Sequence, residues 1–591
     1  MKTNKSIIRL VAIATLIAIS LTLISCEQRL DNKKPSGENI DIEDIVGSID
    51  TSISDNDLDG SYLESDATRI TFADSGATVS GSGASASGSN VTITGEGVYF
   101  VTGSASNGSL TVNSSSASNV QIVLSGLDLT NENGPAINVK NAKKVTVTLE
   151  KGSVNTISDG DSYSIPDGSA YIDGAIFSKS NLVFNGEGEL TVYGNNAHAI
   201  VSKDNITVTG GKYTVVSKKA GLFGKDAVKI SGADIKVEAG TDAIKSDNAL
   251  DSTKGYIHIS SGTLELQSQN DAIQAYTVVS IEGGRIKIKT TGTSSTLSSK
   301  GIKGGSGIAI SGGDFVIDSK DDSIHSNGDV AITGGSFVIN SGDDGIHADK
   351  TVGISGGNIR ISKSFEGIEG TAIIITDGYV DITSNDDGMN ASGGNDGAVN
   401  GDMFGSAKGS ISISGGYIIV HNEGDGIDSN GSLEISGGIV LVDGPSRGGN
   451  SSFDYDTTAK ITGGVVITLG TSDMAQNFSE ATQGSILVRA EGYFTAGTTL
   501  SLCDEEGNVI LAFTSTKNFN GALFSAPELV KGKTYTFYTG ATVAGLDENG
   551  YAHNTTKTGG ESCGSVTLSS LISGQGSGMP GGGGFPGGRP R

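Results

Sequence analysis

Acidic side chains recur along the middle of this chain at an almost constant spacing. Asp322, Asp344, Glu366 and Asp387 are successive members of this series. If each interval of about 22 residues is one turn of a coil, these carboxylates stack about 4.8 Å apart, which is the spacing between neighbouring strands. Two carboxylates at that distance repel each other by roughly 3 to 4 kcal/mol at an effective dielectric constant of 20. The chemistry open to such a column is the binding of cations.

A second acidic column accompanies the first. Asp321, Asp343 and Asp386 each stand one position before a member of the first column. A turn-forming aspartate explains any single copy without an ion, but it does not explain doubled aspartates in nearly consecutive coils. Ca²⁺ takes six to eight oxygen ligands in a tolerant geometry, so we predict calcium bound between coils by both columns. Further predicted ligands are Asp242, Asp247, Asp349, Asp425 and Asp428.

A polar position recurs one residue after the aliphatic member of each copy. Successive strand residues point to opposite faces, so a residue beside a buried aliphatic one should point outward. This polar strip is a candidate carbohydrate groove, although an ordinary solvated face would show the same pattern. Two histidines without cysteines form an incomplete zinc set, so no transition metal is expected. The candidate carbohydrate contacts are Lys303, His325, His347, Glu369 and Asn390.

The repeat that positions these residues has two markers. Its aliphatic position steps from Ile324 to Ile346 and Ile368, and a Ser or Thr followed by two glycines recurs half a turn away, as at 355–357. A unit of short alternating strands and glycine corners cannot bury its apolar face alone, so its copies must stack. The sequence therefore predicts an all-β fold, a parallel β-helix with coils of about 22 residues.

The N-terminus predicts export and a lipid anchor. Basic residues precede an apolar run from Leu10 to Ile24, which is followed by Ser25 and Cys26. This is typical of a bacterial lipoprotein signal, so residues 1–26 are predicted to be the signal peptide and Cys26 the lipidated residue. About 15 apolar residues are short for a membrane span. We expect a secreted lipoprotein at the bacterial cell surface or outer membrane, in contact with the membrane only through this lipid.

The pattern divides the remaining chain into five regions. Polar, acidic residues without a period predict a flexible tether. Two sets of coils follow, first irregular and then regular. A β-rich C-terminal cap and a disordered glycine- and proline-rich tail end the chain. The regions are 27–67 (tether), 68–169 (N-terminal coils and cap), 170–468 (regular coils), 469–572 (C-terminal β-rich region) and 573–591 (tail).

Composition limits the partners. The 591 residues include 40 basic and 66 acidic ones, a formal net charge of −26, which argues against nucleic acid. Tryptophan is absent, so there is no flat indole platform for crystalline cellulose. An acidic protein binds an acidic polymer when cations bridge the two, which favours an anionic ligand. Cys503 and Cys563 could pair in an oxidising compartment, but the sequence does not decide this.

Two motifs carry a family resemblance. Asp-Ser-Ile-His-Ser-Asn-Gly-Asp at 322–329 and Asp-Gly-Ile-His-Ala-Asp at 344–349, with Ser-Gly-Gly at the opposite corner, resemble the bacterial carbohydrate-binding domain proteins. The resemblance covers roughly residues 68–540 and implies a right-handed, single-stranded, polysaccharide-lyase-like β-helix. It also implies calcium held by paired aspartates, and binding of polygalacturonate-like polysaccharide or cellulose. Where the pattern departs, as at Ala220, 271–272 and Lys300, we expect no ion.

Two alternatives to a binding protein stay open. Calcium-dependent pectate lyases of this fold remove a proton with a Lys or Arg, and Lys303, one coil before Asp321 and Asp322, could be that base. A single lysine on a repeating polar face is more often solvated, which favours binding over catalysis. A surface adhesin or structural solenoid is the other alternative. The preferred prediction is a surface-anchored protein that binds acidic polysaccharide through calcium.

Overall fold

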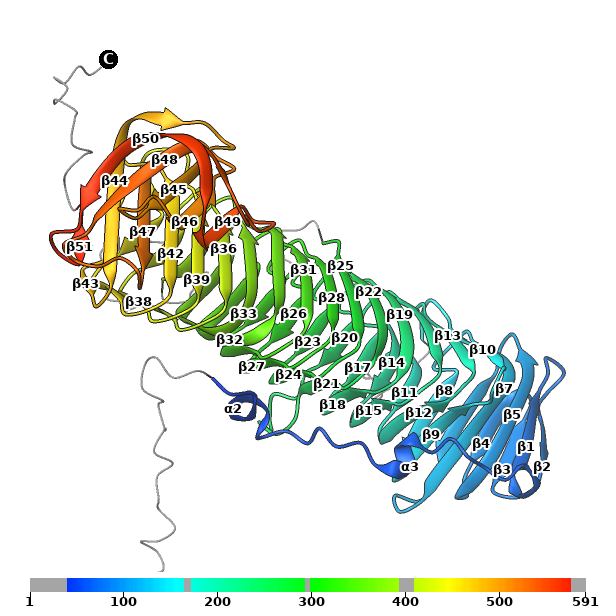
Figure 1. The fold of residues 1–591 in the computed structure, drawn as a ribbon. Coiled ribbons are helices and arrows are strands. Elements are labelled where there is room, and N and C mark those ends of the chain that lie inside the picture. The colour runs from blue at the N-terminus through cyan, green and yellow to red at the C-terminus, as the bar shows by residue number, and fades with distance from the viewer. Residues whose placement is uncertain (1–39, 164–171, 293–297, 393–408, 575–591) are drawn as a thin grey trace, which may run out of the picture. The chain divides into compact units, whose positions relative to one another are not determined.

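The computed structural model describes residues 40–163, 172–292, 298–392 and 409–574. Within these ranges nearly every element is a β-strand (Figure 1). None of the helices found there combines the length and apolar character needed to cross a membrane. The predicted signal peptide with Cys26 and nearly all of the predicted C-terminal tail lie outside the described residues.

The regular coils contain three strands per turn, and each strand pairs in parallel with the strand three places further along the chain. β20 pairs with β23, β21 with β24 and β22 with β25. Repetition of this pattern builds three ladders, called ladders 1, 2 and 3, and the prediction of an all-β fold of stacked parallel coils is confirmed (Figure 1). Irregularly spaced strands precede them: β1 (Thr68–Phe72), β2 (Thr78–Ser80), β3 (Ala84–Ser87), β4 (Asn90–Ile93), β5 (Gly97–Ala105), β6 (Ser109–Asn113), β7 (Asn119–Asn131), β8 (Ile137–Asn141), β9 (Lys144–Leu149) and β10 (Val154–Asp159).

Ladder 1 carries the repeating aliphatic residue. Ile324 pairs with Ile346 and Ile346 with Ile368, and all three are fully buried. The spacing of the repeat thus sets the register, as predicted. The strands are β11 (Gly174–Ser178), β14 (His198–Ser202), β17 (Leu222–Gly224), β20 (Ile244–Ser246), β23 (Ile273–Ala275), β26 (Ile302–Gly304), β29 (Ile324–Ser326), the first residues of β32 (Ile346–Lys363) and β33 (Ile368–Thr383), β34 (Met389–Ala391), β37 (Ile427–Ser429) and β40 (Phe453–Tyr455).

Ladders 2 and 3 close each coil around one apolar core. β28 and β31 alternate exposed and buried residues, and the buried Phe315 and Phe337 stack with ring centroids 4.5 Å apart. The glycine pair separates these two ladders, where Gly335 takes a φ of 101° that L side chains resist. The strands are, in ladder 2, β12 (Asn181–Gly186), β15 (Asn205–Val208), β18 (Ala227–Ile230), β21 (Tyr256–Ile259), β24 (Val278–Ile281), β27 (Gly307–Ile310), β30 (Asp329–Ile332), β35 (Ser410–Ile413), β38 (Ser432–Ile435) and β41 (Thr458–Ile461), and, in ladder 3, β13 (Glu189–Gly194), β16 (Lys212–Ser217), β19 (Ala233–Ala239), β22 (Gly262–Ser268), β25 (Arg285–Thr290), β28 (Asp314–Asp318), β31 (Ser336–Asn340), β36 (Tyr417–His421), β39 (Ile439–Asp443) and β42 (Val465–Gly470), with β32 and β33 continuing through both.

The C-terminal region is rich in antiparallel strands. β47 pairs antiparallel with β42 of the last coil and with β44, and a five-stranded sheet has the order β49-β46-β45-β48-β50. Its apolar core includes Ile419 and Leu441 of ladder 3. Cys503 and Cys563 are both free thiols. The strands are β43 (Glu480–Ala481), β44 (Gly484–Phe494), β45 (Thr499–Cys503), β46 (Val509–Thr514), β47 (Phe519–Ala526), β48 (Thr534–Val543), β49 (Tyr551–Thr555), β50 (Lys557–Thr567) and β51 (Ile572–Ser573).

Residues 40–67, predicted as part of a flexible tether, instead lie along ladder 2 and hold α2 (Ile42–Val46), α3 (Asp55–Leu58) and the short 3₁₀ helix η1 (Glu64–Asp66). The buried Ile45 packs on small side chains of the second ladder, such as Ala309 and Ala331. Lys144 binds Asp57 with 2.6 Å between Nζ and Oδ1. The acidic composition of this segment concealed its apolar residues, which account for the contact.

Removal of this apolar contact should free the segment without unfolding the coils. In Ile45→Asp a charge replaces a buried side chain, which is costly unless the segment leaves the coils. We expect a nonspecific protease to cut within residues 40–66 at least about tenfold faster, while the melting temperature of the coils changes by less than about 2 °C. Unchanged cleavage would contradict the role of Ile45.

Candidate metal centre on ladder 1

Two columns of side chains run along the start of ladder 1. The members of column A stand just before each ladder 1 strand, and backbone hydrogen bonds between successive coils join them, as from Ser323 N to Asp344 O. This confirms the predicted alignment of the first acidic column and extends it at both ends. Column A comprises Asp242, Asp271, Lys300, Asp322, Asp344, Glu366, Asp387 and Asp425.

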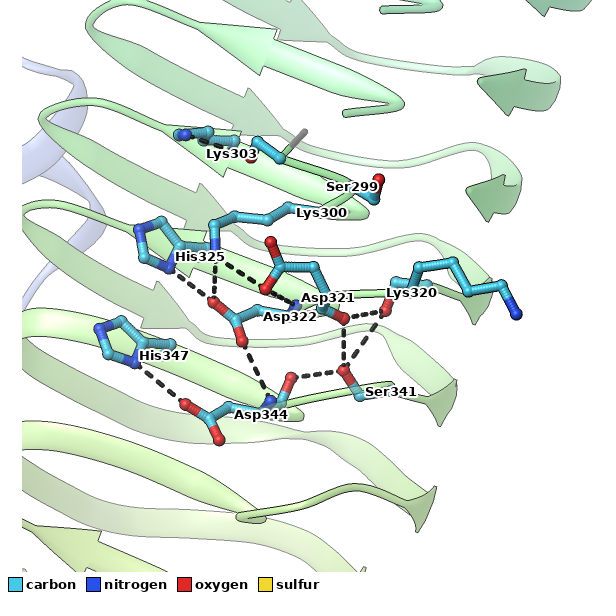
Figure 2. A network of polar contacts seen from close by, with 12 residues as sticks. Ser299, Lys300, Lys303, Lys320, Asp321, Asp322, His325, Ser341, Asp344 and His347 are labelled. Carbon is cyan, nitrogen blue, oxygen red and sulfur yellow. Dashed lines mark hydrogen bonds and ion pairs between the residues drawn. The ribbon is translucent and has the colours of Figure 1, made fainter. Parts of the chain in front are cut away.

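Column B is the polar strip predicted from the sequence, and its register follows the strand pairing of ladder 1. Each member of column B stands three positions after a member of column A, so side chains of the two columns can meet within one coil. Asp322 and His325 illustrate the contact, with 2.8 Å between Oδ2 and Nδ1 (Figure 2). Column B comprises Lys245, Gln274, Lys303, His325, His347, Glu369, Asn390 and Asp428.

In the upper coils, which are those nearer the N-terminus, lysine side chains neutralise the carboxylates. Lys245 Nζ lies 3.1 Å from Asp242 Oδ2, and Lys303 Nζ lies 4.0 Å from Asp271 Oδ2. Both aspartates are buried, and a buried charge is costly unless it is paired, so each lysine stabilises the aspartate beside it. Asp242 was predicted to bind calcium, but the contact with Lys245 already supplies its counter-charge. Asp247, at the other end of β20, joins none of the metal-type clusters found among the described residues.

The middle coils use histidine in the same way. His347 Nδ1 lies 3.2 Å from Asp344 and 2.7 Å from Glu369, while Nε2 lies 3.3 Å from Asp349. Burial opposes the charged imidazole, but the hydrogen bonds to Asp344 and Glu369 prevail and raise the pKa of His347 to about 11. Burial and the negative charges of Asp344 and Glu369 raise the pKa of Glu366 to about 9. His347 is therefore a buried cation among acids.

This burial corrects one prediction about the polar strip. His325 and His347 point to the outer side of the coil as predicted, but their exposed fractions are only 3% and 0%. Their neighbours in columns A and B cover them, so neither ring offers a surface to a polysaccharide. Lys303, Glu369 and Asn390 stay candidate carbohydrate contacts, although Asn390 is 8% exposed.

The lower coils, which lie nearer the C-terminus, bring three carboxylates together, and no lysine, arginine or histidine of the described ranges is paired with them. One ligand oxygen from each of Asp387, Asp425 and Asp428 lies within 4.8 Å of the others, and all three residues are partly exposed. Burial, with the charges of Asp425, Asp386 and Asp428, raises the pKa of Asp387 to about 8. Burial and nearby aspartates likewise raise the pKa of Asp425 to about 6 and that of Asp428 to about 7. We call these three residues the lower acidic cluster.

Two features of the structure fit a cation at the lower acidic cluster. Asn390 donates from Nδ2 to both carboxylate oxygens of Glu366, at 3.0 Å each, while its buried Oδ1 has no hydrogen-bond partner in the described part of the chain. Asn390 pairs directly with Asp428 on the next coil. Any Cβ atom at Gly424 would collide with the Oδ1 atoms of Asp386 and Asp387. The donors are all oxygens, which suits Ca²⁺ better than zinc.

A second acidic cluster, Asp321, Asp322 and Asp343, also has ligand oxygens within 4.8 Å of one another. Unlike the lower acidic cluster, it holds an ammonium, since Lys300 Nζ lies 3.1 Å from Asp321 Oδ1. From the sequence we expected no ion at Lys300, but missed that its side chain reaches the next coil. The sequence does indicate this contact, because Lys300 stands one full repeat before Asp322 in column A and so lies directly beside it on the neighbouring coil.

Stacked parallel coils place this protein in the class of β-solenoids, and comparison with known sequences identifies its family. The model of the carbohydrate-binding domain-containing protein family matches residues 87–345 and 343–501. The chain belongs to this family, as its motifs suggested.

Two similar proteins accompany this match. A carbohydrate-binding domain-containing protein of Acetivibrio thermocellus is 33% identical over 120 residues, which are 20% of this chain and 42% of that relative. The chain thus matches less than half of the relative's length. A solved structure of a polysaccharide lyase-like protein from C. thermocellum, a gadolinium derivative, shows 29% identity over 43% of this chain and 97% of that one, with a TM-score of 0.38.

Proposed function

We propose that this protein binds an anionic polysaccharide of the polygalacturonate type through Ca²⁺ at the lower acidic cluster. The observation that carries the proposal is the group of Asp387, Asp425 and Asp428, whose charges no lysine, arginine or histidine of the described residues neutralises. We include Asn390 Oδ1 as a further ligand; with one oxygen from each carboxylate, the four residues supply four of the six to eight oxygens that Ca²⁺ takes. The remaining positions are open to water or to uronate carboxylates, and the ion then bridges two negative partners.

We also propose the handedness of the coils and the location of the protein in the cell. The coils form a right-handed single-stranded β-helix, the hand that parallel crossover connections take in about 98% of cases. The lipid on Cys26 holds the protein at the bacterial cell surface or outer membrane. Family membership supports carbohydrate as the partner, and the absence of tryptophan favours a charged polymer over cellulose.

The lyase alternative has less support from the geometry. A catalytic base must lie within hydrogen-bond reach of the proton that it removes. Five strand pairings of ladder 1 separate Lys303 from Asp428, which places them roughly 24 Å apart at about 4.8 Å per strand. Lys303 Nζ also lies 3.3 Å from Ser298 Oγ and 4.0 Å from Asp271. Lys303 is therefore too distant to act on a uronate bound at the lower acidic cluster.

Retention on immobilised polysaccharide tests the proposed function. We expect lipid-free protein to be retained on polygalacturonate in calcium and to elute with chelator, because the ion is the only bridge between the two anions. Fully methyl-esterified polygalacturonate is the matched ligand control, since it lacks the carboxylates, and it should not retain the protein. Equal retention on both polymers, or retention in chelator, would refute the ion bridge.

A further inference from the structure

Lys300 occupies a position that neighbouring coils give to a carboxylate. Ala272 N donates to Lys300 O, and Gly301 N donates to Asp322 O, so Lys300 stands in column A between two acids. Its side chain is only 8% exposed and runs toward the next coil (Figure 2). There Nζ lies 3.1 Å from Asp321 Oδ1 and 2.5 Å from Asp322 Oδ2. A lysine is rarely buried to this degree unless it is paired, and here it has two partners.

The carboxylates around this ammonium are arranged as ligands. Asp322 is 2% exposed, and it accepts from His325 Nδ1 at 2.8 Å and from Asp344 N at 3.0 Å. Together with Asp321 and Asp343 it has the spacing of a metal-binding set. The ammonium contacts carboxylate oxygens of Asp321 and Asp322, which are the kind of ligand that Ca²⁺ would take there. An ion and the Lys300 ammonium therefore compete for one position.

The two histidines below this position lie among carboxylates at ligand spacing, His325 beside Asp322 and His347 beside Asp344 and Glu369, but they are poorly placed to share one metal ion. The rings of His325 and His347 stack with centroids 4.7 Å apart and planes inclined by 13°. A metal bound by a ring nitrogen lies close to the plane of that ring, and two stacked planes share no such point. Each Nδ1 instead faces carboxylates of the acidic columns. The carboxylates of these coils therefore already have protein side chains as partners.

We propose that Lys300 is a built-in counter-cation that replaces a metal ion at Asp321, Asp322 and Asp343. These coils then fold without calcium, and the calcium that the proposed function requires is confined to the lower acidic cluster. Only this second statement rests on the proposed function. Along the chain, column A thus changes from coils whose carboxylates contact a lysine or histidine to coils whose carboxylates need a metal ion.

Removal of Lys300 should create a calcium site. In chelator we expect Lys300→Ala to melt roughly 5 °C below the wild type, because it leaves buried charge unpaired. Calcium should restore most of this loss, and the variant should bind one more equivalent than the wild type in equilibrium dialysis. Lys300→Met, which keeps an aliphatic stem in the space, should be destabilised but not rescued. Lys320→Ala is the matched control, since it removes an exposed lysine nearby and should show neither effect.

An equal calcium count in Lys300→Ala and the wild type would overturn the proposal. If Lys300→Ala does not fold, Asp321→Asn in the wild-type background decides, because it should leave the number of bound calcium ions unchanged. Loss of one equivalent in Asp321→Asn would place a metal there and refute the counter-cation role. Both tests compare a variant with the wild type. A wild type that binds no calcium would therefore sink the proposed function and still leave the Lys300 comparison decisive.

Discussion

Replacement of Asp425 and Asp428 by asparagine together is expected to abolish calcium-dependent retention on polygalacturonate and to lower calcium affinity by at least about a hundredfold. Affinity for Ca²⁺ depends strongly on the number of charged ligands, and the double variant keeps only Asp387 of the lower acidic cluster. Asparagine has nearly the shape of aspartate, so the coil should persist. Calorimetric titration gives the affinity, and elution from the immobilised polymer gives the retention.

A second readout separates lost ligands from lost structure. The two substitutions remove charges that repel Asp387 and each other, so the metal-free variant should melt at the same temperature as the wild type or higher at pH 8. A variant that binds no calcium because it is misfolded would melt lower. Lower calcium affinity without a loss of metal-free stability is therefore the expected result.

The matched control makes the same charge change on another face. Asp234 and Asp314 are exposed residues of ladder 3, on β19 and β28. Asp234→Asn with Asp314→Asn should keep wild-type affinity and retention. If this control loses retention as fully as the first double variant, the effect comes from net charge, and the lower acidic cluster is not the site.

The sequence was sufficient to align column A but not to tell which of its members need an ion. A constant period fixes parallel register, so stacked carboxylates such as Asp322 and Asp344 follow from counting. Neutralisation depends on side chains that reach across the coil, as His325 does, or down to the next one, as Lys300 does. The period places the two columns side by side, but the particular contacts between their side chains appear only in three dimensions.

The lower acidic cluster spans an irregular step of the repeat. Asp425 follows Asp387 after a much longer interval than the other members of column A, and the sequence predicts a loop inserted at 393–408, outside the described residues, between two successive coils. In the structure Gly388 N donates to Asp425 O, and the column continues through the insertion. Asp387, Asp425 and Asp428 were all predicted as ligands, and the pairing of Met389 with Ile427 confirms the expected register, but the sequence did not indicate that these three carboxylates would come together as one cluster.

Calcium should stabilise the protein far more at pH 8 than at pH 5. The pKa values of Asp387, Asp425 and Asp428 are raised from 3.8 to about 8, 6 and 7. Around pH 6 an entering ion displaces about two to three protons, so its apparent affinity should rise roughly a hundredfold or more per pH unit. Melting with calcium and with chelator at pH 5, 6.5 and 8 measures this increment.

Without a metal ion, the same three carboxyl groups make the protein less stable as the pH rises. Between about pH 4 and pH 8 the folded lower acidic cluster holds more protons than the unfolded chain, so its contribution to the free energy of unfolding falls as pH rises. Other groups titrate in this range, so the comparison is with the Asp425→Asn, Asp428→Asn variant in chelator. The wild type should lose stability relative to this variant from pH 5 to pH 8. A constant difference, or a calcium increment equal at pH 5 and pH 8, would show that these carboxylates neither repel one another nor hold the ion.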